Sequence, residues 1–366
     1  MPPLRIGVNA LYLIPGEVGG TEIYLHSLLH ALAAVDRDNH YVVFTNRETG
    51  AGLVPDQKNF TVEQQPVHAR FRPARILWEQ TGLPLRVAAR GLDVLWNPGF
   101  TAPLLCGCPQ VTVFHDMQHK RHPEHFRWFD LPFWRLLLYW SAHLSTQLIA
   151  VSAATRDDLL RYYRLPAEVV WSGVDSHFFE IRRSPRNYLL AVSTLHPHKN
   201  LDGLLRAFAQ FHKTRPEFRL VIAGLRGFQT RELEQVCLSL GLEAAVEFTG
   251  WISREKLYEL YAGAFAFVYP TTFEGFGLPL LEALAAGLPA ACSRIEPLAG
   301  LAGGAALLFE PANDAAILEA MTTLATAADL RARLSAAGPP RAAQFSWEAT
   351  ARATLQVLEQ AARQTI

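Results

Sequence analysis

Short apolar runs alternate with longer segments of helical period along almost the whole chain, and this alternation limits the fold more than any single motif does. The first apolar run covers residues 4–9, and the helical segment after it covers residues 21–34. Parallel strands need a crossover connection of about a dozen residues or more, which a helix usually supplies. The alternation therefore predicts the α/β class, with parallel sheets covered by helices.

The same periodicity predicts the later strands and helices. In the first half, strands are expected at residues 41–45, 93–96, 111–114, 147–151 and 168–171, with Ser152 or Thr155 capping a helix that ends at Tyr163. In the second half, strands are expected at residues 188–192, 219–223, 246–249, 265–269, 290–292 and near 305–309. Helices are expected at residues 200–213, 230–240, after Ser253, at 279–287, at about 314–337, and from Ser346 onward.

The alternation is interrupted between residues 173 and 187. Residues 182–187 are polar and contain Pro185, as is common in a connection between domains. A chain of 366 residues, half of them hydrophobic, is long enough for two domains, each with its own core. We expect a first domain at residues 1–173 and a second at 174–349, with a ligand cleft at the carboxyl ends of the strands.

Charge and cysteine content exclude several classes of protein. Lysine and arginine together number 34, as do aspartate and glutamate, so no net field favours nucleic acid, and no nucleic-acid-binding motif is present. The four cysteines are scattered in a chain without a cleavable signal sequence, which indicates a reducing, cytoplasmic setting. Cys106 and Cys108 have no second pair at zinc spacing, so structural zinc is not expected.

Two segments mix aromatic and basic residues, namely residues 70–90 and 126–149. Neither contains the run of about 18 apolar residues that a membrane-spanning helix requires. Such a mixture is typical of peripheral contact with anionic lipid or, more often, of a half-buried helix with a solvated face. We expect the half-buried helix and keep peripheral membrane contact of the first domain as the alternative.

The segment 272–287 places two carboxylates and two glycines at a strand-to-helix junction. Glu274 and Gly275 fall in the loop, Gly277 precedes the helix, Pro279 suits its first turn and Glu282 lies on it. The amides at such a helix start favour an anion such as a diphosphate. Carboxylates repel phosphate, so they make sense there as acceptors for the sugar and ribose hydroxyls that flank it. The alternative is a surface helix with a solvated glutamate and an ordinary turn.

This segment resembles the donor-site motif of the retaining glycosyltransferases of family 4, the group 1 glycosyltransferases, which have the GT-B fold of two facing Rossmann-like domains. The family pattern is Glu, seven residues, Glu, which Glu274 and Glu282 match. The resemblance implies that Glu274 lies beside the donor sugar and that Glu282 holds the ribose. It also implies that the last helix, residues 350–366, packs back on the first domain, and that the donor site includes Gly275, Phe276, Gly277 and Leu278.

The loop that ends in Lys199 resembles the family's phosphate-binding loop in the second domain. Lys199 stands at a strand-to-helix junction, where an ammonium group can neutralise a diphosphate leaving group. An exposed lysine on its own is usually only solvated. Many relatives carry an arginine early in this loop, whereas this chain has Ser193 and Thr194. We therefore expect either one cation fewer at the diphosphate or compensation by Arg294 or His198.

Two stretches of the first half also resemble the family. The loop containing Gly19 and Gly20 resembles the glycine loop after the first strand, which implies that it lies near donor and acceptor and contributes to the donor site. A glycine pair is equally consistent with an ordinary turn. His115 ends a strand as the family's active-site histidine does, or is a satisfied histidine at a strand end, and Asp116 beside it is expected to orient it or bind acceptor. No metal site is expected at residues 119, 122 and 125, because Pro123 interrupts these histidines and their spacing fits no zinc motif.

The resemblance implies transfer of a hexosyl group, with retention, from a nucleoside diphosphate sugar to a hydroxyl of a glycan or lipid-linked acceptor in surface polysaccharide biosynthesis. His115, Glu274 and Lys199 are the expected catalytic residues, and neither a metal nor a further cofactor is expected. GDP-mannose is the first choice of donor. The alternatives are a nucleotide-sugar epimerase or sugar phosphorylase of the same fold, and a non-catalytic subunit that binds donor.

Overall fold

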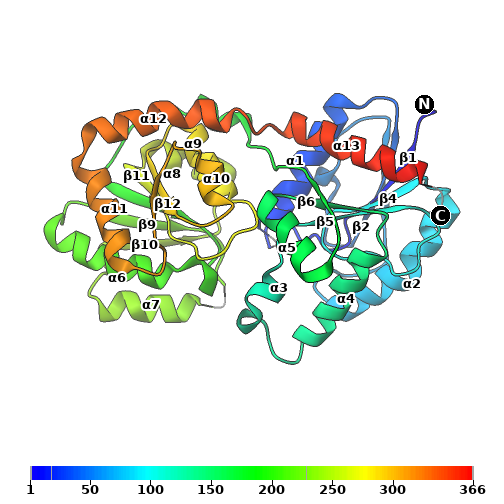
Figure 1. Cartoon of the computed structure of the whole chain (residues 1–366), viewed down its shortest axis with the longest axis horizontal. Helices are drawn as coiled ribbons and strands as arrows, with labels where there is room; N and C mark the ends of the chain where they lie inside the picture. The colour runs from blue at the N-terminus through cyan, green and yellow to red at the C-terminus, as the bar shows by residue number, and fades with distance from the viewer. Residues whose placement is uncertain (1, 18, 228, 365–366) are drawn as a thin grey trace. The chain divides into compact units, whose positions relative to one another are not determined.

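The protein was analysed as a computed structural model, which describes residues 2–17, 19–227 and 229–364. The chain forms two compact units (Figure 1). Unit 1 consists of Met1–Gly173 and Ser346–Ile366, and unit 2 of Val174–Phe345. Each unit contains a parallel β-sheet enclosed by helices, which confirms the predicted α/β class.

In the described part of unit 1, seven parallel strands lie in the order β3-β2-β1-β4-β5-β6-β7. The strands are β1 (Arg5–Asn9), β2 (His40–Thr45), β3 (Phe60–Gln64), β4 (Val94–Asn97), β5 (Gln110–Phe114), β6 (Gln147–Ala150) and β7 (Glu168–Val169). The helices are α1 (Gly20–Val35), α2 (Arg72–Arg90), α3 (Gln118–Arg121), α4 (Leu131–His143), α5 (Ala153–Tyr163) and α13 (Trp347–Arg363). The central strands β4 and β5 are buried throughout, as strands covered on both faces must be.

The last helix, α13, belongs to unit 1, where it packs against α1 (Figure 1). Ser346 caps it by accepting a hydrogen bond from the Ala349 amide at 3.1 Å. The ring of Trp347, the first helical residue, lies 5.9 Å from that of Tyr24 on α1. A β-carbon on Gly173 would come within 2.2 Å of the Trp347 nitrogen, so only glycine fits where the chain leaves unit 1.

In the described part of unit 2, six parallel strands lie in the order β10-β9-β8-β11-β12-β13. The strands are β8 (Tyr188–Val192), β9 (Arg219–Ala223), β10 (Val246–Gly250), β11 (Ala266–Tyr269), β12 (Ala290–Ser293) and β13 (Leu307–Phe309). The helices are α6 (Leu201–Thr214), α7 (Thr230–Ser239), α8 (Arg254–Gly263), α9 (Leu278–Ala285), α10 (Leu298–Ala302), α11 (Asp314–Thr326) and α12 (Ala328–Ala342). Apolar residues of β8, β9, β11 and α6 form the core of this unit.

The strand order reverses beside β1 in unit 1 and beside β8 in unit 2. β1 pairs with β2 on one side and β4 on the other, and β8 pairs with β9 and β11. In open parallel sheets, ligands bind outside the carboxyl ends of the strands at such reversal points. Gly19 follows β1, His115 follows β5, Lys199 follows β8 and Glu274 follows β11, so each predicted residue lies beyond the carboxyl end of a strand.

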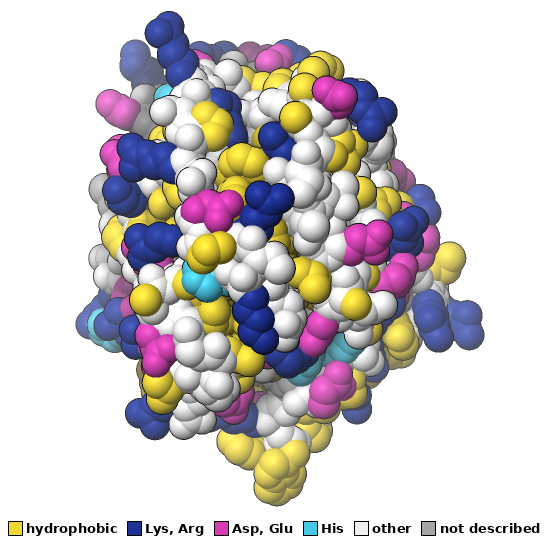
Figure 2. All heavy atoms as spheres, turned by 90° about the vertical axis from the view of Figure 1, so that its left-hand side faces the viewer, with side chains coloured by type: hydrophobic (Ala, Val, Ile, Leu, Met, Phe, Trp, Pro, Cys, Tyr) yellow, Lys and Arg dark blue, Asp and Glu magenta, His cyan; other side chains and the backbone are white. Residues whose placement is uncertain are grey.

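The face of the molecule drawn in Figure 2 carries both signs of charge. Blue lysine and arginine side chains alternate there with magenta aspartate and glutamate side chains, without a large block of either sign. This face therefore has no extended basic surface of the kind that binds nucleic acid.

Candidate functional site

Glu274 lies in the loop between β11 and α9, and its carboxylate is held by two donors. Its Oε1 atom accepts hydrogen bonds from Lys199 Nζ at 2.5 Å and from the Tyr269 hydroxyl at 2.6 Å. The Lys199 ammonium also lies 5.8 Å from the centre of the Tyr269 ring. The two charged side chains are largely buried, so their attraction is stronger than that of a solvated pair. The structure thus joins two residues that the sequence predicted separately, and it adds Tyr269.

The loop that carries Lys199 is tied to the loop that carries Glu274 through the backbone. The carbonyl oxygen of His198 accepts hydrogen bonds from the Thr272 amide at 2.7 Å and from the Thr271 hydroxyl at 2.9 Å. Asn200, whose φ of 51° is left-handed, donates from its side-chain amide to the Pro270 carbonyl at 3.2 Å. These bonds fix the positions of both loops, so Lys199 and Glu274 are presented on a rigid frame.

The start of α9 is shaped to receive an anion. Gly277 has a φ of 114°, and a β-carbon there would lie 2.4 Å from Leu298 Cδ2, so no other residue fits. Pro279 has no N–H, and the amides of Gly277 and Leu278 donate to no acceptor among the residues that the structure describes. These two amides stand at the positive end of the helix dipole, next to the Lys199–Glu274 pair.

Two residues predicted at the donor site differ in exposure. Phe276 is buried, and its ring lies 6.2 Å from that of Phe345, so it packs in the interior of unit 2. Leu278 is half-buried at the first position of α9. Gly275, between Glu274 and Phe276, is also half-buried.

Glu282 points from α9 into a buried polar network. Its Oε2 atom accepts a hydrogen bond from the Tyr261 hydroxyl at 2.9 Å, and its Oε1 atom lies 3.9 Å from Arg254 Nη1. Arg254 also donates to Asp175 at 2.5 Å, and the Tyr258 hydroxyl donates to the same oxygen at 2.6 Å. Burial raises the pKa of Glu282 to about 7, although Arg254 and Tyr261 act in the opposite direction.

Asp175 is the anionic centre of that network. Burial alone would raise its pKa, but hydrogen bonds from Tyr258, His177 and Arg254 together hold the pKa of Asp175 below its ordinary value. The sequence analysis did not predict Arg254, Tyr258, Tyr261 or Asp175 as site residues. The sequence did contain one relevant signal, Ser253. As the N-cap it fixes the first residue of α8, and the helical period then puts Arg254 and Tyr258 on the same face of the helix.

In unit 1, His115 follows β5 and is half-buried. Its Nε2 atom lies 2.7 Å from the Pro98 carbonyl oxygen, so Nε2 carries the proton and donates, which leaves Nδ1 as an acceptor. The rings of Tyr24 and Phe100 lie 4.8 and 5.1 Å from the imidazole. Burial lowers the pKa of His115 to about 4, so the imidazole is neutral near pH 7.

The glycine loop and Asp116 shape the ends of two helices in unit 1. Gly19 has a φ of 63° and forms the N-cap of α1, and Gly20 opens the helix. Glu22 accepts hydrogen bonds from the Gly16 amide at 2.9 and 3.0 Å, which closes the loop over the helix start. Asp116 Oδ1 accepts a hydrogen bond from the Gln118 amide at 2.9 Å and so positions the start of α3.

The side chains expected to compensate for the missing arginine have other partners. Arg294 is mostly exposed and forms an ion pair with Glu310 at 3.3 Å. The ring of His198 stacks near that of His196, with 5.9 Å between centroids. Among the predicted cations, Lys199 is therefore the one that the structure places against Glu274.

The histidines after Asp116 separate into two groups. His119 is buried, and its Nε2 atom lies 2.7 Å from the Tyr163 hydroxyl. His122, Glu124 and His125 have ligand atoms within 4.8 Å of one another, because the turn at Pro123 brings the two imidazoles into a stack. Pro123 therefore does not keep His122 and His125 apart, contrary to the reasoning from the sequence.

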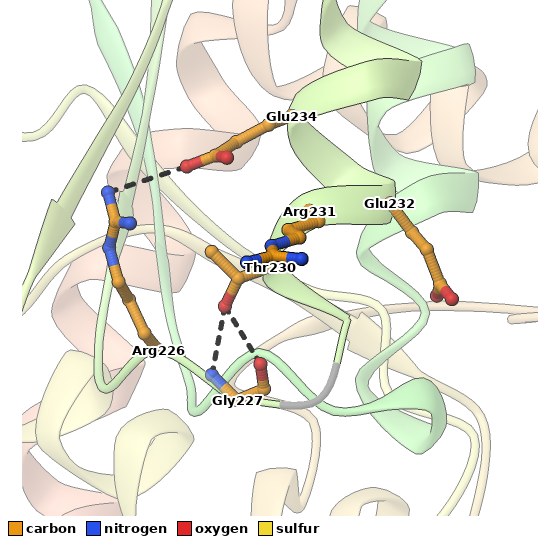
Figure 3. A pocket seen from close by; sticks show the side chains of 6 residues that line it. All are labelled: Arg226, Gly227, Thr230, Arg231, Glu232 and Glu234. Carbon is orange, nitrogen blue, oxygen red and sulfur yellow. Dashed lines mark hydrogen bonds and ion pairs between the residues drawn. The ribbon is translucent and has the colours of Figure 1, made fainter.

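An open hollow of about 440 Å³ lies at the start of α7 in unit 2 (Figure 3). It is lined by Arg226, Gly227, Thr230, Arg231, Glu232 and Glu234. Arg226 forms an ion pair with Glu234 at 3.4 Å, and the Thr230 hydroxyl donates to the Gly227 carbonyl at 2.9 Å (Figure 3). None of the predicted site residues lines this hollow.

Comparison with known families gives a match to each half of the chain. Residues 18–178 match the model described as Glycosyltransferase Family 4. Residues 175–341 match the model described as Glycosyl transferases group 1. The second match contains Lys199, Glu274 and Glu282, and the first contains Gly19, Gly20 and His115.

Individual relatives agree with these matches. The chain is 32% identical over 255 residues to the O-antigen chain mannosyltransferase B of Escherichia coli, an alignment that covers 65% of this chain and 67% of that protein. It is 29% identical over 217 residues to the O-antigen chain mannosyltransferase RfbU of Salmonella typhimurium, covering 58% of this chain and 60% of the relative. The structure of Anabaena Alr3699/HepE in complex with UDP and glucose matches with a TM-score of 0.76 and 21% identity, covering 97% of this chain and 99% of that one.

Proposed function

Because the chain belongs to family 4 of the glycosyltransferases and carries a group 1 glycosyltransferase domain, we propose that it moves a mannosyl group from GDP-mannose to a hydroxyl of a glycan or lipid-linked acceptor. The protein is a glycosyltransferase with the GT-B fold, in which each unit supplies one Rossmann-like half. The mannosyl group and a role in surface polysaccharide synthesis are inferred from the two bacterial relatives named above, whose alignments span about two thirds of their length or less.

One observation carries the proposal, namely the position of the Lys199–Glu274 pair beside the first turn of α9. An ammonium and the free amides of Gly277 and Leu278 suit the two phosphates of a nucleoside diphosphate. Glu274 and Glu282 supply carboxylate oxygens on the same segment, and these suit the hydroxyls of the sugar and of the ribose.

Donor binding requires Lys199 to exchange partners. In the protein alone its ammonium is bound to Glu274. A diphosphate at the start of α9 carries more negative charge than one carboxylate and attracts the same ammonium. Glu274 then accepts from a sugar hydroxyl in place of Lys199 and keeps its hydrogen bond from Tyr269. The pair therefore presents both groups in the right place and neutralises them until substrate arrives.

The proposed chemical step breaks the bond between the anomeric carbon and the diphosphate oxygen and forms a bond from that carbon to the acceptor oxygen. The acceptor proton passes to the departing diphosphate on the same face, which gives retention. Lys199 and the α9 amides stabilise the charge that develops on the diphosphate. Glu274 is not assigned as a covalent nucleophile, because in the donor complex its carboxylate accepts hydrogen bonds from a sugar hydroxyl and from the Tyr269 hydroxyl, and these lower its nucleophilicity.

His115 acts in this scheme as a neutral hydrogen-bond acceptor. Its Nε2–H group is committed to the Pro98 carbonyl, so Nδ1 accepts a hydrogen bond from a substrate hydroxyl. A cationic general acid is disfavoured, because burial keeps the pKa of the imidazole near 4. Since Lys199 and the helix start provide the positive charge that the diphosphate needs, we propose that the reaction requires no metal ion.

We further propose peripheral contact with an anionic membrane through α4. No helix among the described residues is long and apolar enough to cross a bilayer. Phe133, Leu136 and Trp140 nevertheless form an exposed apolar stripe at helical spacing on α4, with exposures of 49, 60 and 43%. Arg72 of α2 lies over the Trp134 ring at 5.2 Å and places a cation beside the stripe. Apolar and basic groups in this arrangement suit the interface of an anionic bilayer.

A panel of nucleotide sugars separates this function from the alternatives. GDP-mannose is expected to raise the melting temperature of the protein in a concentration-dependent way. Transfer of the sugar away from the nucleotide is expected to be fast only when an acceptor glycan is present. Turnover of the donor to an isomer without an acceptor would indicate an epimerase. Donor binding without turnover under any condition would indicate a non-catalytic subunit.

A further inference from the structure

Arg75 on α2 is a buried cation whose guanidinium donates to no acceptor among the residues that the structure describes. Only 7% of the residue is exposed, and its Nε atom has no hydrogen-bond partner. Neither a hydrogen bond nor an ion pair joins its guanidinium to another group in the part of the chain that the structure describes. Burying a guanidinium with unused donors costs free energy, so such an arginine is unusual unless it binds something.

The one buried carboxylate on the same helix face, that of Glu79, attracts the Arg75 guanidinium electrostatically but accepts no hydrogen bond from it among the described contacts. Glu79, one turn later, is 1% exposed, and its Oε1 atom accepts a hydrogen bond from Asn9 Nδ2 at 3.4 Å. Asn9 in turn donates to Asn97 at 3.1 Å, so Glu79 belongs to a polar network at the ends of β1 and β4. Burial raises the pKa of Glu79, whereas the charge of Arg75 and hydrogen bonds from Thr101 and Asn9 act in the opposite direction.

Arg75 lies at the sheet edge that carries the other predicted residues of unit 1. It interacts electrostatically with Tyr12, which follows β1. The Tyr12 hydroxyl donates to the Thr21 carbonyl on α1 at 3.3 Å, one residue after Gly20. A β-carbon on Gly99, after β4, would lie 2.3 Å from the Tyr12 ring. Tyr12 therefore lies between Arg75 and the start of α1, and it connects Arg75 to the glycine loop.

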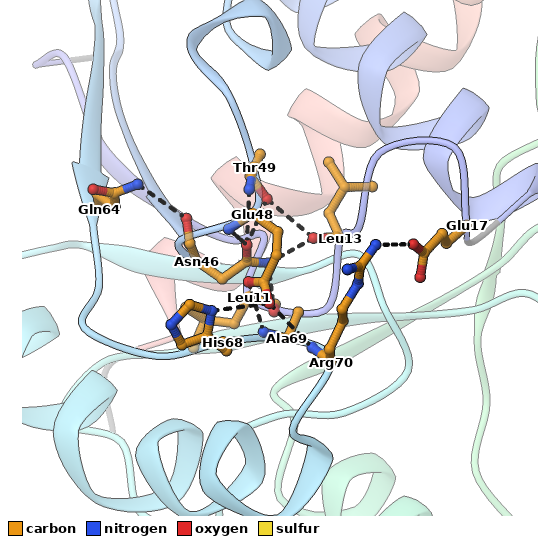
Figure 4. A network of polar contacts seen from close by, with 10 residues as sticks. All are labelled: Leu11, Leu13, Glu17, Asn46, Glu48, Thr49, Gln64, His68, Ala69 and Arg70. Carbon is orange, nitrogen blue, oxygen red and sulfur yellow. Dashed lines mark hydrogen bonds and ion pairs between the residues drawn. The ribbon is translucent and has the colours of Figure 1, made fainter.

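The first turn of α2, which carries Arg75, is positive, and Glu79 lies one turn further along the helix. The first turn of α2 contains no acidic residue and has no side-chain cap. Arg72 lies in the same turn, and Arg70 precedes it and bonds Glu17 of the glycine loop (Figure 4). The helix dipole adds a partial positive charge at this end. An anion therefore meets one buried and two more exposed arginines next to the loop between β1 and α1.

We propose that Arg75 binds an anionic oxygen group, a phosphate or a carboxylate, of the acceptor. The proposal rests on the proposed function, in which unit 1 holds the acceptor. The planar guanidinium of arginine matches the two oxygens of either group. The acceptor is accordingly an anionic saccharide or a sugar joined to a phosphate, and a neutral sugar alone binds poorly.

Titration calorimetry with three small probes tests this assignment. Mannose 1-phosphate, mannuronate and mannose are each titrated into the full-length protein in the presence of GDP, which occupies the proposed phosphate site in unit 2. We expect at least one of the two anionic probes to bind and mannose not to bind, and the two anionic arms distinguish phosphate from carboxylate. The Arg75→Gln variant should weaken the anionic probe about tenfold or more. Arg75→Lys should retain part of the affinity, because the positive charge remains. The rest is lost because lysine lacks the paired N–H donors of the planar guanidinium.

Arg86→Gln is the matched control, since Arg86 is an exposed arginine on the same helix, 3.8 Å from Glu63. It should bind the anionic probe as the unmodified protein does. Equal binding of the anion by Arg75→Gln and by the unmodified protein, or equal binding of mannose and mannose 1-phosphate, would overturn the proposal. GDP binding, measured on the same samples, reports separately on the proposed function. If Arg75→Gln does not fold, Arg75→Lys and the mannose comparison still decide the question.

Discussion

Lys199 Nζ lies 2.5 Å from Glu274 Oε1, although the two residues are 75 positions apart in the sequence. Lys199 ends the loop after β8, and Glu274 stands in the loop after β11, the neighbouring strand. The parallel sheet therefore brings together a cation for phosphate and a carboxylate for a sugar hydroxyl. Each group neutralises the other in the protein alone, so neither remains as an uncompensated buried charge.

Replacing Lys199 with methionine should lower kcat/KM for transfer by about 10²–10³-fold, because the departing diphosphate loses its ammonium partner.

Glu274→Ala should abolish measurable transfer and leave the fold intact. Initial rates over a range of donor concentrations measure both effects. Glu310→Gln, at an exposed ion pair with Arg294 in the same unit, is the control and should retain full activity. Normal activity of Lys199→Met would disprove its role.

Glu282 should make the stability of the protein depend on pH. Burial raises its pKa from 4.5 to about 7 in the folded protein, so the folded state binds more protons than the unfolded state between these values. The stability that it contributes is present below about pH 4.5 and is lost as the pH rises through 7. The free energy of unfolding of Glu282→Gln, relative to that of the unmodified protein, should therefore be higher at pH 8 than at pH 5 by on the order of 1–3 kcal/mol. Urea unfolding at both pH values measures this, and parallel curves for the two proteins would contradict it.

His115 should remain neutral, with its proton on Nε2, throughout the range from pH 6 to pH 8. Its pKa is lowered to about 4, so the folded state binds fewer protons than the unfolded state between that value and 6.5. The stability that His115 contributes is therefore present above pH 6.5 and falls as the pH decreases toward 4. Nitrogen chemical shifts of the imidazole give the tautomer directly. A protonated Nδ1 at pH 7 would show that the hydrogen bond to Pro98 is absent.

The exposed stripe on α4 should bind anionic vesicles. Leu136→Ser should reduce co-sedimentation with vesicles that contain phosphatidylglycerol about threefold or more, because about half a leucine's transfer free energy is lost. Leu238→Ser on α7 removes a side chain of similar exposure, 63% against 60%, from unit 2 and should have no effect. Equal loss in both variants would indicate a non-specific response to surface hydrophobicity.

Local sequence signals predicted the elements of unit 2 well. Strands β8 and β9 occupy the residues expected from their apolar runs, and Ser253 and Ser346 cap helices as their positions suggested. Strand β3 was missed, because only Phe60 at its start is buried and the rest of this edge strand lacks a continuous apolar run. The helices expected at about 314–337 are α11 and α12, but α12 continues past the expected end, through Pro339 and Pro340 to Ala342.

The candidate site was only partly predictable for a different reason. The glycine-containing segment after β11 pointed to Glu274 and Glu282, and the resemblance of the loop after β8 to that of the family pointed to Lys199. The groups that hold them, Tyr269 and Arg254, carry no motif and come from a strand interior and a helix start. Their role follows from the register of the sheet and from helix packing, which a single sequence does not specify.

A crystal structure of the protein bound to GDP-mannose tests the central claim most directly. The account predicts that the diphosphate lies against the first turn of α9, with Lys199 Nζ on a phosphate oxygen and the Glu274 carboxylate on a hydroxyl of the sugar. A diphosphate bound at another place, with the Lys199–Glu274 pair still closed, would contradict it.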